Sequence, residues 1–416
     1  MLLLVGNDLV EIERIRKSMK NPRFCSRVLG VAESAQLAMR GFPVQSVAAS
    51  FCAKEAYSKA VGTGLGAFDL REVQLLRDVK SGRPELSLSG KALQLANGTH
   101  FSVTVTHTEK YASVVVIGEG TDQMILTESE GLRTLKAMLK PRAAESNKGD
   151  YGRLLCICGS EGMAGAATMS VGSALHCGAG IVEAALPDSI YPVVAARLAE
   201  PVFTLLHPLP DGSASERDKI GLTQALSRAS AVLIGCGLGK SPAAHSEVLQ
   251  VLKESAVPVI LDADGINIAA EHIDVLKTAG TPLILTPHPG EMARLLKTTA
   301  ADVQAHRTEI ARRFALEYHV ILVLKGAGTL VSSPDGKLYR NTTGNPGMAK
   351  GGSGDVLAGM IASFAAQGVD PYEAAVGAVY LHGLAGDRCA AMYSQISMLP
   401  TDMVGMLPKL FSEIGR

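Results

Sequence analysis

Short apolar runs recur from Gly152 onward, and each is followed by a Gly- or Pro-rich turn and then by a helical pattern. The clearest runs are 154–158, 231–234, 258–261, 282–285 and 320–324. Strands without hydrophobic–polar alternation are typical of a parallel sheet buried on both faces. Repeated strand, loop and helix therefore predict an α/β fold with helices on both sides of the sheet. In such folds ligands bind at the carboxyl ends of the strands, so the loops that follow the runs are the candidate site.

The first part of the chain has a different pattern, which predicts a compact α+β module. Strands are expected at 2–10, 72–77, 85–88, 101–106 and 112–117, and helices at 47–61 and 91–96. After a polar stretch with one weakly amphipathic helical segment at 128–139, the α/β pattern begins. We expect domains at 1–118 and 147–416, joined by a linker at 119–146.

The formal net charge is zero, from 40 basic and 40 acidic residues, but this balance is a cancellation. Residues 1–120 contain 15 basic and 11 acidic side chains, and the other 296 residues contain 25 and 29. The overall balance argues against a nucleic-acid partner. The mildly basic first part suits an acidic partner.

The apolar stretches are of strand length, well short of the roughly 20 residues that span a membrane. The first residues reach Asn7 and Asp8 too soon for a signal peptide. Seven scattered cysteines indicate reduced thiols, and Cys156 with Cys158 lacks the second pair that a tetrahedral zinc site needs. We therefore expect a cytoplasmic protein with no zinc and no membrane partner.

Asp8 and Glu55 are the candidate metal ligands of the first module. Asp8 ends the first predicted strand, and Glu55 lies on the helix with Lys59 one turn further on. Two carboxylates can share Mg²⁺, which also takes phosphate oxygens, and Lys59 could meet a phosphate. The alternative, which the spacing alone favours, is an ion pair between Glu55 and Lys59 on a solvated helix face.

Residues 1–118 resemble the holo-acyl-carrier-protein synthase family in several ordered blocks. These are GNDLVEI at 6–12, RF at 23–24, RVL at 27–29, FCAKEAYSKA at 51–60, GTG at 62–64 and THT at 106–108. The resemblance implies transfer of 4′-phosphopantetheine from coenzyme A to a serine of acyl carrier protein, by a homo-oligomer. It implies Asp8 and Glu55 as Mg²⁺ ligands, Lys59 as a phosphate contact and His107 near coenzyme A, although His107 could equally be a hairpin residue satisfied by backbone.

A basic cluster follows Asp8, and acyl carrier proteins of this type are acidic. Its members are Arg14, Arg16, Lys17, Arg23 and Arg27. The cluster is either the docking surface for the carrier protein or an ordinary solvated helix. Gly30 and Thr106 depart from the family pattern, which commonly has Thr and Ser there.

The glycine-rich block NPGMAKGGSGDVLAG at 345–359 carries the strongest signal of the second module. A glycine turn that leads into an apolar helix leaves backbone N–H groups free to bind phosphate. Asp355 at that helix start could be a first-turn carboxylate or a base beside the phosphates. Four further loops follow predicted strands: KGAGT at 325–329, TPHPGE at 286–291, GCGLG at 235–239 and LDADGIN at 261–267.

In this order the loops resemble the ADP-dependent (S)-NAD(P)H-hydrate dehydratase family over about 130–416, with NKGDYGR at 147–153 and YLHGLAGD at 380–387. The resemblance implies a ribokinase-like fold and ADP-driven loss of water from hydrated NADH or NADPH. Asp355 would be the base, with Gly352 to Gly354 around the phosphoryl group. Lys325, Gly326, Ala327, Gly328 and Thr329 would line the nucleotide site, and Ala166, Gly237 or Gly239, and His288 would contact the hydrated cofactor.

The fold has a rival activity, because vitamin-precursor kinases share it. The alternative is therefore an ATP-dependent small-alcohol kinase, which the TPHPGE and NPGMAKGGSGD blocks disfavour. Cys236 departs from the dehydratase pattern, which usually has Pro between these glycines. A third possibility, one module decayed to a scaffold, conflicts with the presence of Asp8, Glu55 and Asp355.

Overall fold

A computed structural model describes residues 2–78, 81–96, 99–120 and 129–415. The chain divides into two compact units, Met1–Thr127 and Glu128–Arg416. This division falls inside the segment predicted as a linker, of which residues 121–128 lie outside the described residues. The predicted helical stretch at 128–139 is α6 (Glu130–Met138), which packs on α17 (Pro371–Ser397) in the second unit.

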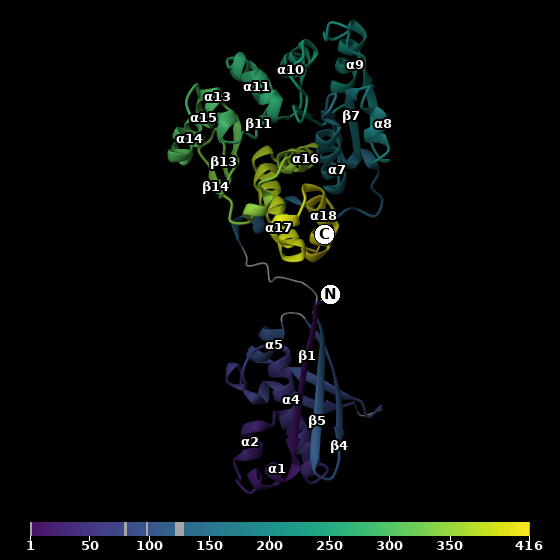
Figure 1. Cartoon of the computed structure of the whole chain (residues 1–416), viewed down its shortest axis with the longest axis vertical. Helices are drawn as coiled ribbons and strands as arrows, with labels where there is room; N and C mark the ends of the chain where they lie inside the picture. Colours follow the sequence, from purple (N-terminus) through teal and green to yellow (C-terminus); the bar gives the residue numbers. More distant parts are fainter. Residues whose placement is uncertain (1, 79–80, 97–98, 121–128, 416) are drawn as a thin grey trace. The chain divides into compact units, whose positions relative to one another are not determined.

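The first unit has the predicted α+β architecture. A three-stranded antiparallel sheet in the order β1-β5-β4 packs against the long helix α4, and β2 and β3 form a separate hairpin (Figure 1). The hydrophobic core lies between that sheet and α4, with Val47, Ala53, Val114 and Val116 fully buried. The elements are β1 (Leu2–Glu11), α1 (Ile12–Ser18), α2 (Phe24–Val28), α3 (Val31–Ala38), α4 (Val44–Ala60), β2 (Val73–Arg77), β3 (Pro84–Leu88), α5 (Gly90–Ala96), β4 (His100–His107) and β5 (Tyr111–Gly120).

A buried ion pair fixes α4 in this unit. The ammonium of Lys54 donates to both carboxylate oxygens of Glu33, at 2.9 and 2.8 Å, and to the carbonyl of Val73 at 2.7 Å. Both side chains are fully buried. The carboxylate also accepts from the backbone N–H groups of Gly30 and Leu75. The pair therefore joins α3, α4 and β2 through satisfied hydrogen bonds.

Replacing Lys54 with Met should lower the free energy of unfolding of the first unit by about 3–5 kcal/mol, because it leaves the Glu33 carboxylate buried without a counter-ion. Chemical denaturation of the full chain measures this effect. The control is the double variant Lys54→Met, Glu33→Gln, which removes both charges and should lose less stability. A single variant as stable as the double variant would show that the buried charge is not the cause.

The second unit is built on a nine-stranded sheet in the order β14-β13-β12-β11-β10-β9-β6-β7-β8. From β12 to β8 neighbouring strands are parallel, whereas β12, β13 and β14 pair antiparallel. This confirms the predicted α/β class. The strands are β6 (Arg153–Ile157), β7 (Ile181–Pro187), β8 (Val202–Leu206), β9 (Ala231–Ile234), β10 (Val259–Leu261), β11 (Leu283–Leu285), β12 (Ile321–Leu324), β13 (Leu330–Ser332) and β14 (Leu338–Arg340).

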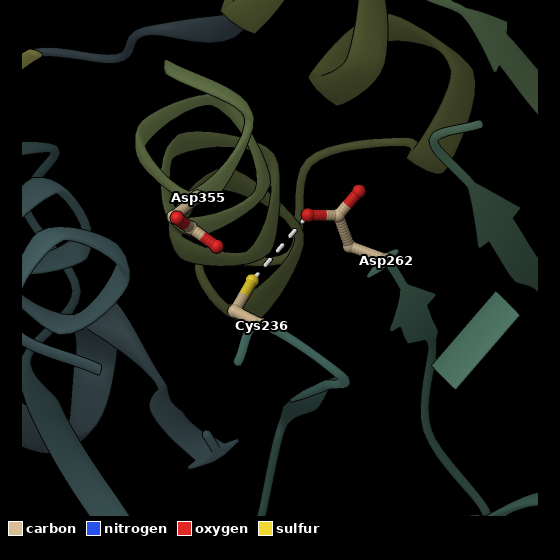
Figure 2. Close-up of side chains that lie close together, drawn as sticks. All are labelled: Cys236, Asp262 and Asp355. Carbon is tan, nitrogen blue, oxygen red and sulfur yellow. Dashed lines mark hydrogen bonds between the residues drawn. The ribbon is translucent and has the colours of Figure 1, made fainter. Parts of the chain in front are cut away.

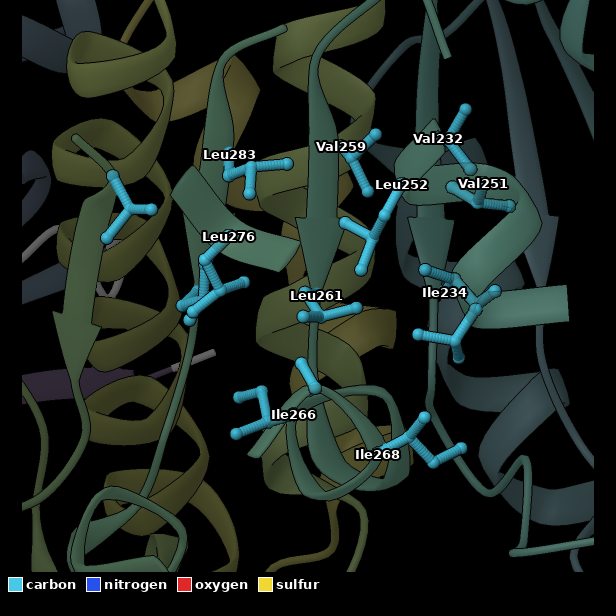
Figure 3. Packing of buried hydrophobic residues seen from close by; sticks show 14 of the residues in the cluster. Val232, Ile234, Val251, Leu252, Val259, Leu261, Ile266, Ile268, Leu276 and Leu283 are labelled. Atoms are coloured by element: carbon cyan, nitrogen blue, oxygen red, sulfur yellow. The ribbon is translucent and has the colours of Figure 1, made fainter. Parts of the chain in front are cut away.

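Helices cover both faces of this sheet. Alternate strand residues, such as Val232, Ile234, Val259 and Leu261, face one helical layer, and Figure 3 shows them packed with side chains of that layer. That layer comprises α9 (Glu216–Leu226), α10 (Pro242–Glu254), α11 (Ala263–Glu271), α12 (Val275–Thr278), α13 (Pro289–Leu296), α14 (Ala300–Ala305) and α15 (Arg307–Tyr318).

The opposite layer contains the helix that carries the predicted phosphate loop. Its helices are α6, α7 (Ala164–His176), α16 (Ser353–Ala366), α17 and α18 (Pro400–Glu413), with the short α8 (Tyr191–Ala195) against α7. Of these, α16 packs directly on β9, β6 and β10, so its first turn reaches the carboxyl edge of the sheet. Within the described ranges, no helix has both the length and the apolar character needed to cross a membrane.

Candidate active sites

Asp8 lies where β1 passes close to α4. A Cβ on Gly6 would come within 1.9 Å of a backbone oxygen of α4, so this close approach requires glycine. Two residues further along the same face of the strand, the Asp8 carboxylate accepts from Lys59 Nζ at 2.8 Å and from the Cys52 thiol at 3.2 Å. The hydrogen bond to Asp8 raises the pKa of Lys59. Lys59 thus forms its ion pair with Asp8 on β1 and not with Glu55 on its own helix.

Glu55 lies three residues after Cys52 and four before Lys59, so it belongs to the face of α4 that Asp8 meets. The Asp8 side chain is 11% exposed and that of Lys59 is 51% exposed. Two carboxylates with an accessible ammonium beside them are a donor set that suits Mg²⁺ with a phosphate ligand. His107 ends β4 opposite Ala112, and its ring is exposed.

The glycine-rich segment of the second unit forms the start of α16. Gly352 is the N-cap with φ of 101°, and the first N–H groups of a helix have no intrahelical acceptor. A Cβ on Gly354 would lie 3.1 Å from Lys325 Nζ, so this ammonium stands beside the first helical turn. A helix N-terminus and an ammonium both attract negative charge. Lys325 and α16 therefore form one anion site.

Asp355 projects from the first turn of α16 toward Cys236 and Asp262 (Figure 2). One atom from each of the three side chains lies within 4.8 Å of the other two. Burial, followed by the negative charge of Asp262, raises the pKa of Asp355 to about 6, against opposing effects of Cys236 and Lys325. A carboxylate with this pKa is ionised at neutral pH and can accept a proton, as a general base must.

Asp262, directly after β10, holds the ammonium of Lys325. Its Oδ1 accepts from Lys325 Nζ at 2.8 Å and from the Thr286 hydroxyl at 2.6 Å. Burial pushes the pKa of Asp262 up, but Lys325 and these hydrogen bonds bring it below its ordinary value. Burial likewise opposes the charge on Lys325, but Asp262 and Glu291 raise its pKa overall. Both members of the pair are therefore ionised, and Asp262 fixes the position of the Lys325 ammonium. Because Lys325 already balances the charge of Asp262, we assign no metal ion to Cys236, Asp262 and Asp355 (Figure 2).

A cavity of about 520 Å³ opens beside the anion site. This volume suits a nucleotide-sized ligand. Arg307, at the start of α15, donates to the carbonyls of Leu324, Lys325 and Gly328 and so holds the loop after β12. The cavity wall contains the whole predicted nucleotide loop, Lys325, Gly326, Ala327, Gly328 and Thr329, with parts of 341–349, 353–357 and 379–383.

The loops after β6 and β9 contact each other. Gly237 has φ of 61°, and a Cβ there would lie 2.6 Å from the Cβ of Ala166. The Ser160 hydroxyl donates to the carbonyl of Gly237 at 2.8 Å, and the N–H of Gly239 donates to Asp264 at 2.8 Å. The structure thus brings Ala166, Gly237 and Gly239 together at the carboxyl edge of the sheet. Their contact with a ligand stays a prediction.

His288 is the N-cap of α13, and its ring is half exposed at the same edge. Its Nδ1 accepts from the N–H groups of Gly290 and Glu291, at 2.9 and 3.3 Å. Burial, followed by the charges of Lys325 and Arg294, lowers the pKa of His288. A neutral ring that accepts at Nδ1 carries its proton at Nε2, 3.3 Å from a Glu291 oxygen. His288 is therefore a rigidly held donor, and its contact with substrate stays a prediction.

Three residues around this site received no role from the sequence. Asp262 lies in the predicted edge loop 261–267, directly after a strand, but the sequence predicts no separate role for this carboxylate. His382 is the one strongly polar side chain in the apolar stretch 374–386, a weaker signal. Arg307 begins a helix of ordinary polar pattern, and nothing in the sequence marks it as the support of the loop after β12.

A nine-stranded sheet with a glycine-rich anion site and a carboxylate of raised pKa at its carboxyl edge is the arrangement of a ribokinase-like enzyme domain. In agreement, a family model of NAD(P)H-hydrate dehydratase matches residues 154–409, and one of the 4′-phosphopantetheinyl transferase superfamily matches residues 4–115. The chain belongs to the NAD(P)H-hydrate dehydratase family, and its first unit is a transferase domain of the second superfamily.

Individual relatives match the second unit. The bifunctional NAD(P)H-hydrate repair enzyme of Moorella thermoacetica is 44% identical over 274 residues, which are 66% of this chain and 52% of that enzyme. The ADP-dependent (S)-NAD(P)H-hydrate dehydratase of Neisseria meningitidis is 39% identical over 273 residues, 65% of this chain and 86% of the relative. The chain thus spans about half the length of the bifunctional relatives.

A solved structure supports the fold. It is the ADP/ATP-dependent NAD(P)H-hydrate dehydratase of Bacillus subtilis, co-crystallised with ATP and Mg²⁺. Its sequence is 31% identical, its TM-score is 0.59, and the match covers 68% of this chain and 97% of that one. A ribokinase-like superfamily protein of Enterococcus faecalis also matches, with 28% identity and a TM-score of 0.60 over 69% of this chain and 98% of that one, which confirms the ribokinase-like fold predicted from the sequence.

Proposed function

We propose that the second unit dehydrates the S epimer of hydrated NADH or NADPH at the expense of ADP. The observation that carries this proposal is Asp355, a partly buried carboxylate with a pKa of about 6, beside the anion site of Lys325 and α16. Identity to dehydratases named for ADP and for NAD(P)H hydrate supports the choice of substrates. The adjoining cavity has the volume for the nucleotide.

The hydroxyl of the hydrated ring is a poor leaving group, and phosphorylation improves it. Asp355 takes the hydroxyl proton while the oxygen bonds to the terminal phosphorus of ADP and AMP leaves. Lys325 and the first N–H groups of α16 stabilise the charge on the transferring phosphoryl group. Phosphate then leaves the ring carbon, and loss of the neighbouring proton restores the double bond. The products are NAD(P)H, AMP and phosphate.

The remaining edge residues are assigned to binding. Gly326, Ala327, Gly328 and Thr329 line the nucleotide cavity with Lys325. We place the hydrated cofactor against Ala166 in the first turn of α7, Gly237 and Gly239 in the loop after β9, and His288 at the N-cap of α13. An ATP-dependent small-alcohol kinase could use the same base and anion site, but the family match favours the dehydratase.

The dehydratase should lose activity as pH falls through about 6, because Asp355 must be ionised to accept a proton. Below that pH, kcat/KM should fall about tenfold per pH unit, and above it the profile should be flat. Phosphate release is the suitable readout, since reduced nicotinamides decompose in acid. Asp262→Asn removes a charge that raises the pKa of Asp355 and should move the acid limb to lower pH. An acid limb that stays in place in this variant would contradict the assignment.

We further propose that the first unit transfers 4′-phosphopantetheine from coenzyme A to a serine of acyl carrier protein, supported by the superfamily match at 4–115. Asp8 and Glu55 would hold Mg²⁺. The ion would offset the negative charge of the coenzyme A pyrophosphate and stabilise the charge that develops at the phosphorus under attack. Lys59, half exposed beside Asp8, would bind a phosphate. We place His107 near coenzyme A.

The basic cluster is the proposed docking surface for the acidic carrier protein. Its five side chains are all exposed, on and around α1 and α2: Arg14, Arg16, Lys17, Arg23 and Arg27. We also propose a homo-oligomer, because the outer face of β1 and β5 exposes Val5, Leu9, Tyr111 and Ile117. With seven free cysteines we place the protein in the cytoplasm. We propose 1–118 and 147–416 as the two catalytic domains, with 119–146 between them; within that segment α6 packs on α17 and so adds to the second unit.

A further inference from the structure

Lys350 lies in the glycine-rich turn before α16, but its side chain contacts the corner between α17 and α18. Its ammonium donates to the carbonyls of Ile396 and Met398, both at 2.7 Å. These two residues end α17, and the last carbonyls of a helix have no donor within the helix. A positive charge is also favourable at a helix C-terminus. Lys350 therefore satisfies acceptors that the end of α17 leaves open.

This contact differs from the role that the position of Lys350 in the sequence suggests. A lysine beside two glycines at a helix start is a common phosphate ligand. The nucleotide cavity, however, is lined by Ala349 and Ser353, and Lys350 is not among the described residues of its wall. To bind a phosphate, the ammonium would have to leave both carbonyls. The geometry therefore favours an anchor between the turn and α17 over a ligand contact.

The turn has few other constraints between Lys350 and the helix. At Gly351 no described atom outside its chain neighbours lies within 4 Å of where a Cβ would stand. Gly352 has φ of 101°, and a pair of glycines loses much conformational entropy when it is ordered. The carbonyl of Lys350 accepts from the N–H of Ser353, the first residue of α16, at 3.3 Å. Holding Lys350 in place therefore also holds the start of α16.

We propose that Lys350 is a positioning residue, which anchors the glycine-rich turn to α17 and thereby places the first N–H groups of α16 for phosphoryl transfer. This inference rests on the proposed function, because it takes these N–H groups to stabilise the transferring phosphoryl group. A misplacement of about 1 Å in such a site can slow the reaction about 100-fold. Lys350 acts through the backbone of the turn and does not touch the substrate.

Hydrogen exchange of the unliganded full-length protein, followed by mass spectrometry, tests the anchor. In Lys350→Met the amides of 347–353 should exchange about tenfold faster than in the wild type, because several of them are protected by hydrogen bonds within the turn. In kinetics kcat should fall about 10–100-fold. KM for ADP should change less, since the nucleotide loop at 325–329 is untouched. Lys350→Arg, which keeps a charged donor, should restore part of both effects.

The matched control is Lys337→Met, which removes an exposed lysine of the same unit that pairs with Asp335 at 3.0 Å. It should leave both the exchange of 347–353 and kcat unchanged. If Lys350→Met does not fold, the milder change Lys350→Gln is judged by the same two measurements.

Normal exchange in Lys350→Met would overturn the proposal even if kcat fell, because a phosphate contact would alter the rate without altering the unliganded turn. Faster exchange with a normal kcat would also overturn it. In both cases the wild type still forms NADPH, and the proposed dehydratase function stands. Wild-type protein that forms no NADPH from the hydrate and ADP would instead remove the proposed function and this inference with it.

Discussion

Replacing Asp355 with Asn should lower kcat of the dehydratase by about 10²–10⁴-fold, the usual contribution of a positioned general base. Asn has the shape of Asp but cannot take the hydroxyl proton. Burial and the charge of Asp262 both disfavour the ionised carboxylate of Asp355. Removing this charge should therefore not destabilise the fold. Single-turnover formation of NADPH from the hydrate and ADP measures the effect, and calorimetry should show that ADP still binds.

The alternative role of Asp355 is that of a first-turn carboxylate that only stabilises its helix. Asp402 provides the matched control, because it lies in the first turn of α18 and accepts from the N–H of Leu399 at 2.7 Å. Asp402→Asn should cost at most about 1 kcal/mol of stability and leave kcat unchanged. Asp355→Asn protein with nearly normal kcat would contradict the assignment of the base.

Replacing Asp8 with Ala should lower modification of apo-acyl-carrier protein by about 10²–10³-fold and leave the dehydratase unchanged. The reason is the loss of a carboxylate ligand to Mg²⁺, whose charge stabilisation is worth several kcal/mol in such reactions. Mass spectrometry of the carrier protein detects the added phosphopantetheine. NADPH formation by the same preparation reports whether the second unit is intact.

Asp8→Ala also removes an ion pair with Lys59, and Asp69 provides the control for that loss. Asp69 forms an exposed ion pair with Arg71 in the same unit, so Asp69→Ala removes an ion pair without touching the proposed metal site. Such exposed pairs contribute little to stability, and modification should proceed normally. Asp8→Ala protein that modified the carrier at the normal rate would contradict the metal-ligand assignment.

The sheet of the second unit could be predicted where its strands are apolar on both faces, as in β6 and β9–β12. β7 was not predicted, because Glu183 interrupts its apolar run. The structure buries this carboxylate and satisfies it with Arg153, Arg228 and Thr204, which are distant in sequence. β13 and β14 have three residues each, too few for a periodicity.

The site could be predicted where its chemistry lies within one segment, and Asp355 with its glycine turn is such a segment. Pairings between segments could not be predicted. Spacing along α4 favoured Glu55 as the partner of Lys59, but the structure pairs Lys59 with Asp8, 51 residues away. Asp262 acquires its role only when folding places Lys325 beside it. These assignments depend on tertiary contacts that a local pattern does not contain.

The most direct test of the central claim is to incubate the full-length protein with (S)-NADPH hydrate and ADP and to follow the absorbance of NADPH. The proposed function predicts that NADPH appears, with AMP and phosphate formed in equal amounts. Failure to form NADPH with either ADP or ATP would contradict it, as would a stable phosphorylated product in place of NADPH.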